Sequence, residues 1–236
     1  MRTIAHITDI HLDEGLLEDL GVNTERNWRR ILKDVAARGI HDVVFGGDIG
    51  APTSYSWFFN TVKHFSFRYV VGNHDDVDDA ERYFDGHSDG NEELYYALEE
   101  DGYKQVFMDT SSEHVSDAQL QWLTQQINTD RPILLYIHHP VLGIDTPIDR
   151  KYPLHGRDQV KKALLSNLGP VTIFCGHYHM DDMQQVGNIT QYVTPAASYQ
   201  IAKEAGGIEK DNGKFGYRIV RIDEKNIQTE LVMFDA

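Results

Sequence analysis

The chain has 236 residues, of which 41% are hydrophobic, and a formal net charge of −15. This length suffices to bury a full hydrophobic core, and because the composition shows no break we expect a single domain over residues 1–236. The acidic charge is spread along the chain and disfavours long nucleic acids, whose phosphates need a basic surface. No apolar run reaches membrane-spanning length and no leader precedes the first strand, so we expect a cytoplasmic protein with no membrane partner. The sequence leaves homo-oligomerisation open.

Strands are predicted where apolar runs end abruptly in polar residues. Each of these runs carries unusual residues at its C-terminal end, as buried strands with functional loops do. The runs span residues 3–8, 43–45, 69–71, 133–137 and 171–175.

Helices are predicted between these strands. Apolar side chains spaced three and four residues apart predict helices around Trp28 and around Trp57. Ser116 begins a capping box that predicts a helix over residues 116–128, and a further helix is predicted over residues 157–168.

The C-terminal third is rich in β-forming residues. Strands are predicted over residues 189–194, 217–222 and 227–234, the last two as a hairpin. Alternating strands and helices followed by a β-rich end predict an α/β sandwich with more than one sheet.

Short polar motifs follow the first two strands. Asp9-Ile10-His11 places a carboxylate and an imidazole where alternate side chains of an extended backbone project to one side and can meet one ion. Gly46-Gly47-Asp48 adds a carboxylate after glycines that allow close approach of the backbone. Taken alone, the D-x-H triplet is common by chance, and the glycine motif is more simply an ordinary turn.

A third motif, Gly72-Asn73-His74-Asp75, follows the next strand. Asn73 offers a neutral amide oxygen, and His74 beside it can donate a proton or stabilise developing charge. An ordinary Asn-His turn explains this motif about as well.

Two histidine motifs complete the set. His138-His139-Pro140 offers at least one imidazole, and Gly176-His177-Tyr178-His179 places two imidazoles on the same side of an extended segment, which is rare for packing. The five motifs together supply oxygen and imidazole donors of the kind that suits Mn, Fe or Zn. If the substrate is an anion, such ions supply the positive charge that the acidic chain lacks.

The motifs D-x-H, G-D, G-N-H-D, H-x-P and G-H-x-H, in this order over residues 9–179, resemble those of the calcineurin-like metallophosphoesterase superfamily. The resemblance implies a four-layer sandwich of two mixed β-sheets flanked by helices, with a metal site on loops at strand C-terminal ends. It also implies two divalent or mixed-valence ions. Carried over by position, Asp9, His11 and His179 hold one ion, Asn73, His138 and His177 hold the other, and Asp48 bridges both.

The resemblance also separates the two adjacent histidines. His138 is preferred to His139 as the ligand because the superfamily ligand stands two residues before proline. His139 then contacts the substrate or packs against its loop. The implied reaction is attack on phosphorus by a hydroxide held between the ions, with His74 as the catalytic residue that assists the departing oxygen.

One departure from the superfamily pattern concerns the partner of His74. In the protein Ser/Thr phosphatases, the bridging aspartate is followed three residues later by another aspartate and then by a phosphate-gripping arginine. Ala51 and Pro52 stand at these positions here. What orients His74 is therefore open, with Asp75 as a candidate.

Three further sequence segments narrow the expected activity. Residues 107–110, 116–123 and 194–196 resemble the cyclic-nucleotide and glycerophosphodiester phosphodiesterase branch. Because few Lys or Arg residues are expected near the ions, we expect hydrolysis of small phosphodiesters. We expect these substrates to enter through a mouth shaped by residues 85–91 and 143–152. The alternatives are a phosphomonoesterase or pyrophosphate hydrolase on the same metal centre and, from another class, a non-catalytic scaffold of this fold.

Overall fold

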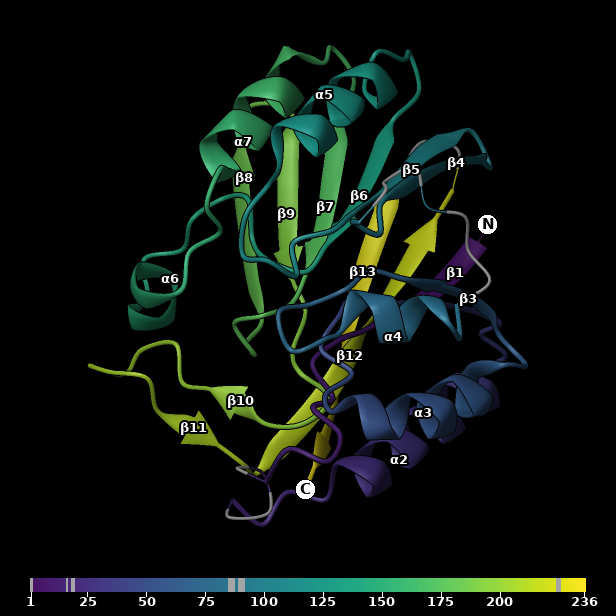
Figure 1. Ribbon diagram of the computed structural model, residues 1–236, viewed down its shortest axis with the longest axis vertical. Coiled ribbons are helices and arrows are strands. Elements are labelled where there is room, and N and C mark those ends of the chain that lie inside the picture. The colour runs from purple at the N-terminus through teal and green to yellow at the C-terminus, as the bar shows by residue number, and fades with distance from the viewer. Residues whose placement is uncertain (1, 16, 18–19, 85–87, 89–91, 224–225) are drawn as a thin grey trace.

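The computed structural model describes residues 2–15, 17, 20–84, 88, 92–223 and 226–236 (Figure 1). Its main elements are two large β-sheets packed face to face, with helices on their outer faces. Among the described residues, no helix combines the length and the apolar character that a membrane span requires.

The first sheet has the strand order β13-β12-β1-β2-β3. The N-terminal strands β1, β2 and β3 run parallel, whereas β12 pairs antiparallel with both β1 and β13. The strands are β1 (Arg2–Ile7), β2 (Asp42–Phe45), β3 (Ser66–Tyr69), β12 (Lys214–Ile222) and β13 (Ile227–Asp235).

The second sheet has the order β4-β5-β6-β7-β9-β8, with a parallel centre and antiparallel strands at both edges. A separate two-stranded ribbon, β10 and β11, lies beside the C-terminal ends of the parallel strands. These strands are β4 (Tyr96–Glu100), β5 (Tyr103–Met108), β6 (Ile133–Ile137), β7 (Val171–Cys175), β8 (Asp182–Val186), β9 (Ile189–Val193), β10 (Gln200–Ile201) and β11 (Lys210–Asp211).

The helices form the two outer layers (Figure 1). Helices α2 and α3 cover the first sheet, and α5 and α7 cover the second. The helical elements are α2 (Thr24–Ala37), η1 (Pro52–Ser54), α3 (Tyr55–Val62), α4 (Val77–Glu81), α5 (Asp117–Gln126), α6 (Pro147–Lys151) and α7 (Arg157–Ser166).

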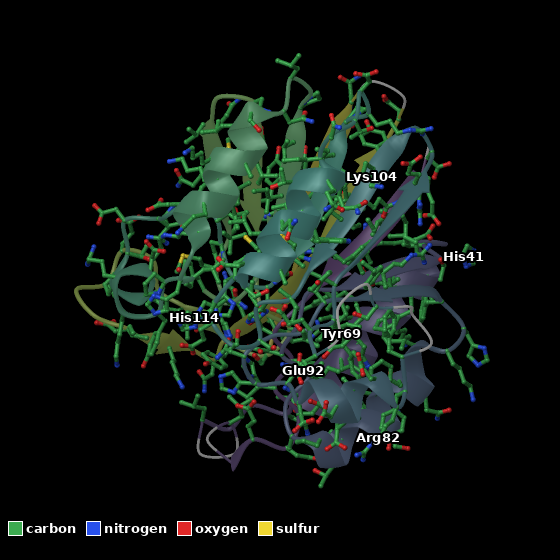
Figure 2. All side chains as sticks on the ribbon, turned by 45° about the horizontal axis from the view of Figure 1, so that its top comes forward. His41, Tyr69, Arg82, Glu92, Lys104 and His114 are labelled. Carbon is green, nitrogen blue, oxygen red and sulfur yellow. The ribbon has the colours of Figure 1, made fainter. Side chains whose placement is uncertain are left out.

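Three apolar clusters fill the spaces between these layers. Trp28 and Phe58 pack beneath the first sheet, and Leu123 and Val160 pack above the second. A third cluster, which includes Tyr136, fills the interface between the sheets. Figure 2 shows the exposed charged side chain of Arg82 near the lower edge of the molecule.

The structure confirms the predicted fold class, an α/β sandwich of two mixed sheets flanked by helices. The boundaries differ slightly from those predicted. The strand predicted over residues 69–71 ends at Tyr69, and the helices predicted to end at residues 128 and 168 end at Gln126 and Ser166. The prediction of a single domain stays a prediction.

The predicted capping box at the start of α5 forms only in part. Ser116 accepts a hydrogen bond from the backbone N–H of Gln119 at 3.0 Å, as expected for an N-cap. The Gln119 side chain turns instead to the backbone of Asp109, donating to its carbonyl and accepting from its N–H. It therefore ties α5 to the end of β5.

Candidate metal centre

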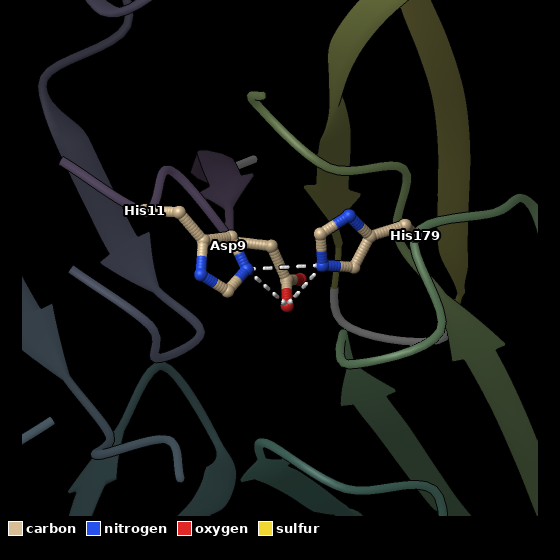
Figure 3. Close-up of side chains that lie close together, drawn as sticks. All are labelled: Asp9, His11 and His179. Carbon is tan, nitrogen blue, oxygen red and sulfur yellow. Dashed lines mark hydrogen bonds and ion pairs between the residues drawn. The ribbon is translucent and has the colours of Figure 1, made fainter. Parts of the chain in front are cut away.

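The first group of possible metal ligands is Asp9, His11 and His179, which lie side by side and are buried (Figure 3). Nε2 of His179 lies 3.3 Å from Oδ1 of Asp9, and Nε2 of His11 lies 4.0 Å from the same oxygen. The loops after β1 and β7 thus bring together side chains that are 170 residues apart in the sequence, to within about the spacing of ligands on one ion.

The two imidazoles of this group are held by their other nitrogens. Nδ1 of His11 lies 2.9 Å from Oε1 of Glu14, and Nδ1 of His179 lies 3.0 Å from the carbonyl oxygen of Tyr199. Because Nδ1 donates in each case, the two Nε2 lone pairs face each other at 3.1 Å. A cation between these lone pairs and the Asp9 carboxylate would relieve their repulsion.

The second group is Asp48, His138 and His177. Nε2 of His138 lies 3.1 Å from Oδ2 of Asp48, while its Nδ1 donates to the carbonyl oxygen of Gly46 at 2.7 Å. His177 approaches the carbonyl oxygen of Tyr152 through Nε2 at 3.3 Å, which leaves its Nδ1 as the free nitrogen.

The two groups adjoin each other. Oδ2 of Asp48 lies 3.6 Å from Nε2 of His11, and Oδ1 of Asp9 lies 3.9 Å from Nε2 of His138. Each carboxylate therefore reaches toward an imidazole of the other group. This is the arrangement that a shared anionic ligand requires.

Charge at the junction favours a cation. Although burial favours the neutral acid, His138 and His11 hold the pKa of Asp48 well below its usual range. Burial opposes charge on His138 as well, but Asp48 raises the pKa of this imidazole to about 10. A buried carboxylate that attracts positive charge this strongly is a suitable metal ligand.

Asn73 supplies a further test of metal binding. Its Oδ1 is buried and has no hydrogen-bond partner among the described residues. An orphaned buried carbonyl oxygen is costly, and a metal ion would satisfy it. With Asn73, the donors fit Mn, Fe or Zn, because they combine carboxylate, amide and imidazole.

The backbone at the donor residues is strained. Five of them have the positive φ of the left-handed region, which side chains other than that of glycine rarely adopt. The φ values are 57° for Asp9, 53° for His11, 63° for Asp48, 67° for His177 and 49° for His179. The extended segments predicted for the two motifs Asp9–His11 and His177–His179 are therefore not observed. Such strain costs about 1–3 kcal/mol per residue and concentrates at functional sites.

Two glycines allow the loops to approach so closely. A Cβ atom on Gly72 would lie 2.1 Å from Oδ1 of Asp48, and one on Gly176 would lie 2.3 Å from Oδ2 of Asp9. Any other residue would displace a carboxylate of the centre. The glycines of the sequence motifs are thus required sterically.

The partner of His74 is Glu14. The sequence alone did not identify Glu14 as a residue of the site. Nδ1 of His74 lies 3.0 Å from Oε1 of Glu14, the oxygen that also holds His11. The Glu14 hydrogen bond raises the pKa of His74 to about 9. Although burial favours the neutral acid, His11 and His74 lower the pKa of Glu14 to about 2. An acidic residue three positions after the D-x-H motif was the only available signal.

Asp75, the candidate partner of His74, has another role. Its carboxylate accepts hydrogen bonds from the backbone N–H groups of Asp48, Ile49 and Gly72 and from the hydroxyl of Tyr69, at 2.7–2.9 Å. It thereby fixes the two loops that carry Asp48 and Asn73. The suggestion that Asp75 orients His74 is wrong.

His139 is fully enclosed. Its Nδ1 lies 2.9 Å from the hydroxyl of Thr110, and its ring centre lies 4.0 Å from that of His177. Burial, together with the charges of His177 and His138, holds the pKa of His139 well below its usual range. Of the two alternatives for His139, the geometry favours packing over substrate contact.

A cavity of about 360 Å³ opens over the two donor groups. The expected mouth segment, residues 143–152, contributes Ile148, Lys151 and Tyr152 to its lining. Residues 85–87 and 89–91 of the other expected segment lie outside the described residues. Lys151 and Lys210 line the cavity, so the expectation of few nearby basic residues needs correction. The remaining lining residues are His11, Glu14, Leu17, Asp48, Asn73, His74, Glu113, His177, His179, Tyr199, Ile201 and Ile208.

Comparison with known proteins agrees with this geometry. The model of the calcineurin-like phosphoesterase family matches residues 2–181, and the chain belongs to this family of hydrolases. Residues 182–236 complete both sheets beyond the matched region.

Two relatives bear names from the cyclic-nucleotide and glycerophosphodiester phosphodiesterase branch, which the sequence motifs predict. A "probable cyclic nucleotide phosphodiesterase" of Fibrobacter succinogenes is 30% identical over 208 residues, which are 84% of this chain and 80% of the relative. A "probable glycerophosphodiester phosphodiesterase" of Arcobacter nitrofigilis is 28% identical over 175 residues, which are 68% of this chain and 64% of the relative.

Among solved structures, a purple acid phosphatase from yellow lupin (Lupinus luteus) seeds superposes with a TM-score of 0.74 at 13% identity. The superposition covers 98% of this chain and 51% of the plant protein, so the chain spans about half of that protein's length. This likeness supports the fold.

Proposed function

We propose that this protein hydrolyses small phosphodiesters at a dinuclear metal centre. The observation that carries the proposal is the junction of the two donor groups, at which Asp48 lies within 3.6 Å of imidazoles from both. A single ion would leave one of these groups unused.

The donors divide between two ions, with Asp48 as the shared ligand. Manganese, iron and zinc all suit this set of oxygen and imidazole donors. When bound, such ions neutralise phosphoryl oxygens and lower the pKa of water to near neutrality. Asp9, His11 and His179 hold the first ion, and Asn73, His138 and His177 hold the second.

The protonated His74 is the group that assists the leaving oxygen. It lies on the cavity wall, and its Nδ1 is fixed by Glu14, so its Nε2 is the nitrogen free to reach the substrate. Glu14 favours the protonated imidazole, because their hydrogen bond raises the pKa of His74. His74 therefore holds a proton ready for the departing alkoxide.

Charge favours a diester over a monoester. A diester carries one negative charge where a monoester carries nearly two at neutral pH. No arginine of the described residues lines the cavity, and Ala51 and Pro52 replace the acidic residue and arginine of the Ser/Thr phosphatases. The names of the two relatives support the same preference.

The alternative activity is hydrolysis of a phosphomonoester or pyrophosphate. Lys151 and Lys210 favour it, since two ammonium groups on the cavity lining would stabilise an additional negative charge. A non-catalytic scaffold is disfavoured because a donor residue stands at every ligand position of the family motifs and His74 is present as well.

Matched nitrophenyl substrates decide between these activities. The manganese-loaded protein should hydrolyse bis(p-nitrophenyl) phosphate with a higher kcat/KM than p-nitrophenyl phosphate. A clear preference for the monoester would overturn the diesterase assignment while leaving the metal centre in place. Protein treated with a chelator serves as the control and should hydrolyse neither ester.

A further inference from the structure

An exposed aromatic residue belongs to the lining of the cavity. Tyr152 is among the lining residues, and 42% of its surface is exposed. Its backbone carbonyl contacts His177 of the metal centre at 3.3 Å. Tyr152 thus contacts the centre through its backbone and is itself an exposed residue of the cavity lining.

The segment that carries Tyr152 is held firmly. It follows helix α6, whose Asp149 accepts hydrogen bonds from the guanidinium of Arg157 and the hydroxyl of Tyr178, each at 2.5 Å. The Tyr178 hydroxyl also lies 3.4 Å from the Tyr152 carbonyl. The backbone that carries the ring is therefore already ordered, which limits the ordering entropy lost on binding.

The cavity lining also includes three isoleucines. They are Ile148 from α6, Ile201 from β10 and Ile208 from the β10–β11 ribbon. The other tyrosine, Tyr199, is only 8% exposed, and its ring lies 4.4 Å from that of His179. Tyr152 is therefore the accessible aromatic surface of the cavity.

We propose that Tyr152 stacks on the base of a nucleoside phosphodiester and determines the substrate class of this site. The inference rests on the proposed diesterase function. It selects nucleoside phosphodiesters over glycerophosphodiesters as the substrates. A nucleobase would use the ring and the isoleucines, whereas a glycerol chain presents no flat apolar group to them. Base stacking on an aromatic side chain typically changes affinity by about tenfold or more.

The two lysines suit the same substrate. Nζ of Lys151 lies 4.9 Å from the centre of the Tyr152 ring, and Nζ of Lys210 lies 4.9 Å from the centre of the Tyr199 ring. Both ammonium groups thus stand at the cavity lining, where they draw an anion into an otherwise acidic molecule.

The test compares two cyclic phosphates that differ only in the base: cyclic AMP and the cyclic phosphate of methyl riboside, which has a methoxy group instead. With manganese bound, the wild type should favour cyclic AMP by about tenfold in kcat/KM. Tyr152→Ala should abolish this preference by lowering the rate on cyclic AMP much more than the rate on the methyl riboside phosphate, because the carbonyl that contacts His177 remains. Tyr152→Phe should keep the preference.

Tyr83→Ala is the matched control, since Tyr83 is 44% exposed, stacks on Phe59 and is not among the residues that line the cavity. It should change neither substrate's rate. A second measurement compares binding of AMP and ribose 5-phosphate to the metal-loaded proteins, and only AMP should bind more weakly to Tyr152→Ala. Metal content should be equal in all variants.

Two results would overturn the stacking role: equal wild-type rates on the two cyclic phosphates, or an equal loss on both in Tyr152→Ala. Failure of the diesterase function itself is recognised separately, because bis(p-nitrophenyl) phosphate would then remain intact as well.

Discussion

The carboxylate of Glu14 lies 3.0 Å from Nδ1 of His74, and the same oxygen lies 2.9 Å from Nδ1 of His11. One acidic residue thus joins a possible metal ligand to the proposed proton donor. The side chain of Glu14 is only 22% exposed, so the pair is partly shielded from water. Glu14, which follows the first strand, takes the place of the acidic partner that the Ser/Thr phosphatases carry after their bridging aspartate.

Removal of the Glu14 carboxylate should weaken catalysis through His74. We expect Glu14→Ala to lower kcat by about 10–100-fold, as is typical when a residue that orients a site group is removed. In a His74→Ala background the same substitution should have a much smaller effect. Additive losses in this double-mutant cycle would show that Glu14 acts through His11 alone, and the metal content of each variant provides an independent check.

His74→Ala should retain both ions yet lose about 10²–10⁴-fold in turnover, the range for an acid–base group that is not a ligand. Elemental analysis and diester hydrolysis on the same sample measure the two quantities. Loss of an ion from this variant would instead make His74 a ligand.

Asp48→Asn should lower the occupancy of both ions, because Asp48 is proposed as their shared anionic ligand. Asp78→Asn, an exposed acidic residue of α4, is the control and should bind metal normally. Unchanged metal content in Asp48→Asn would remove Asp48 from the bridging position.

The strand-end motifs were predictable because a buried apolar run and the polar residues after it are adjacent in the sequence. The structure places the described loops after β1, β2 and β7 and the turn near Asn73 around one cavity, and it brings His138, after β6, to within 3.1 Å of Asp48. Local spacing also predicted α5 and α7, whose ends moved by only two residues.

The partner of His74 could not be predicted in this way. Glu14 and His74 are 60 residues apart, so their contact depends on how two loops meet in space. Asp75 was the better candidate by adjacency, but the turn directs its carboxylate to the backbone N–H groups of Asp48 and Gly72. The positive φ values of the donors likewise arise from tertiary contacts, since local preference opposes them.

His6 should make stability depend on pH. It is buried with Nδ1 2.7 Å from the Thr194 hydroxyl, and burial together with the Arg218 charge lowers its pKa from 6.5 to about 3. Because the folded pKa lies below the unfolded value, the neutral ring contributes stability above pH 6.5 that is lost as pH falls toward about 3.

At about pH 5, protonation of His6 in the unfolded chain should reduce the unfolding free energy by about 2 kcal/mol relative to neutral pH. Urea unfolding of chelator-treated wild type and His6→Gln, at both pH values, isolates this contribution. The variant should show the weaker pH dependence. Identical pH dependence of the two proteins would mean that His6 does not titrate in this range.

The central claim is a centre that needs two ions for diester hydrolysis, and a manganese titration of chelator-treated protein tests it most directly. Bound manganese and the rate on bis(p-nitrophenyl) phosphate are measured on the same samples. We predict that the rate rises until two ions are bound per chain and then stays constant. A rate that is complete at one ion per chain, or that needs no metal, would contradict the dinuclear centre.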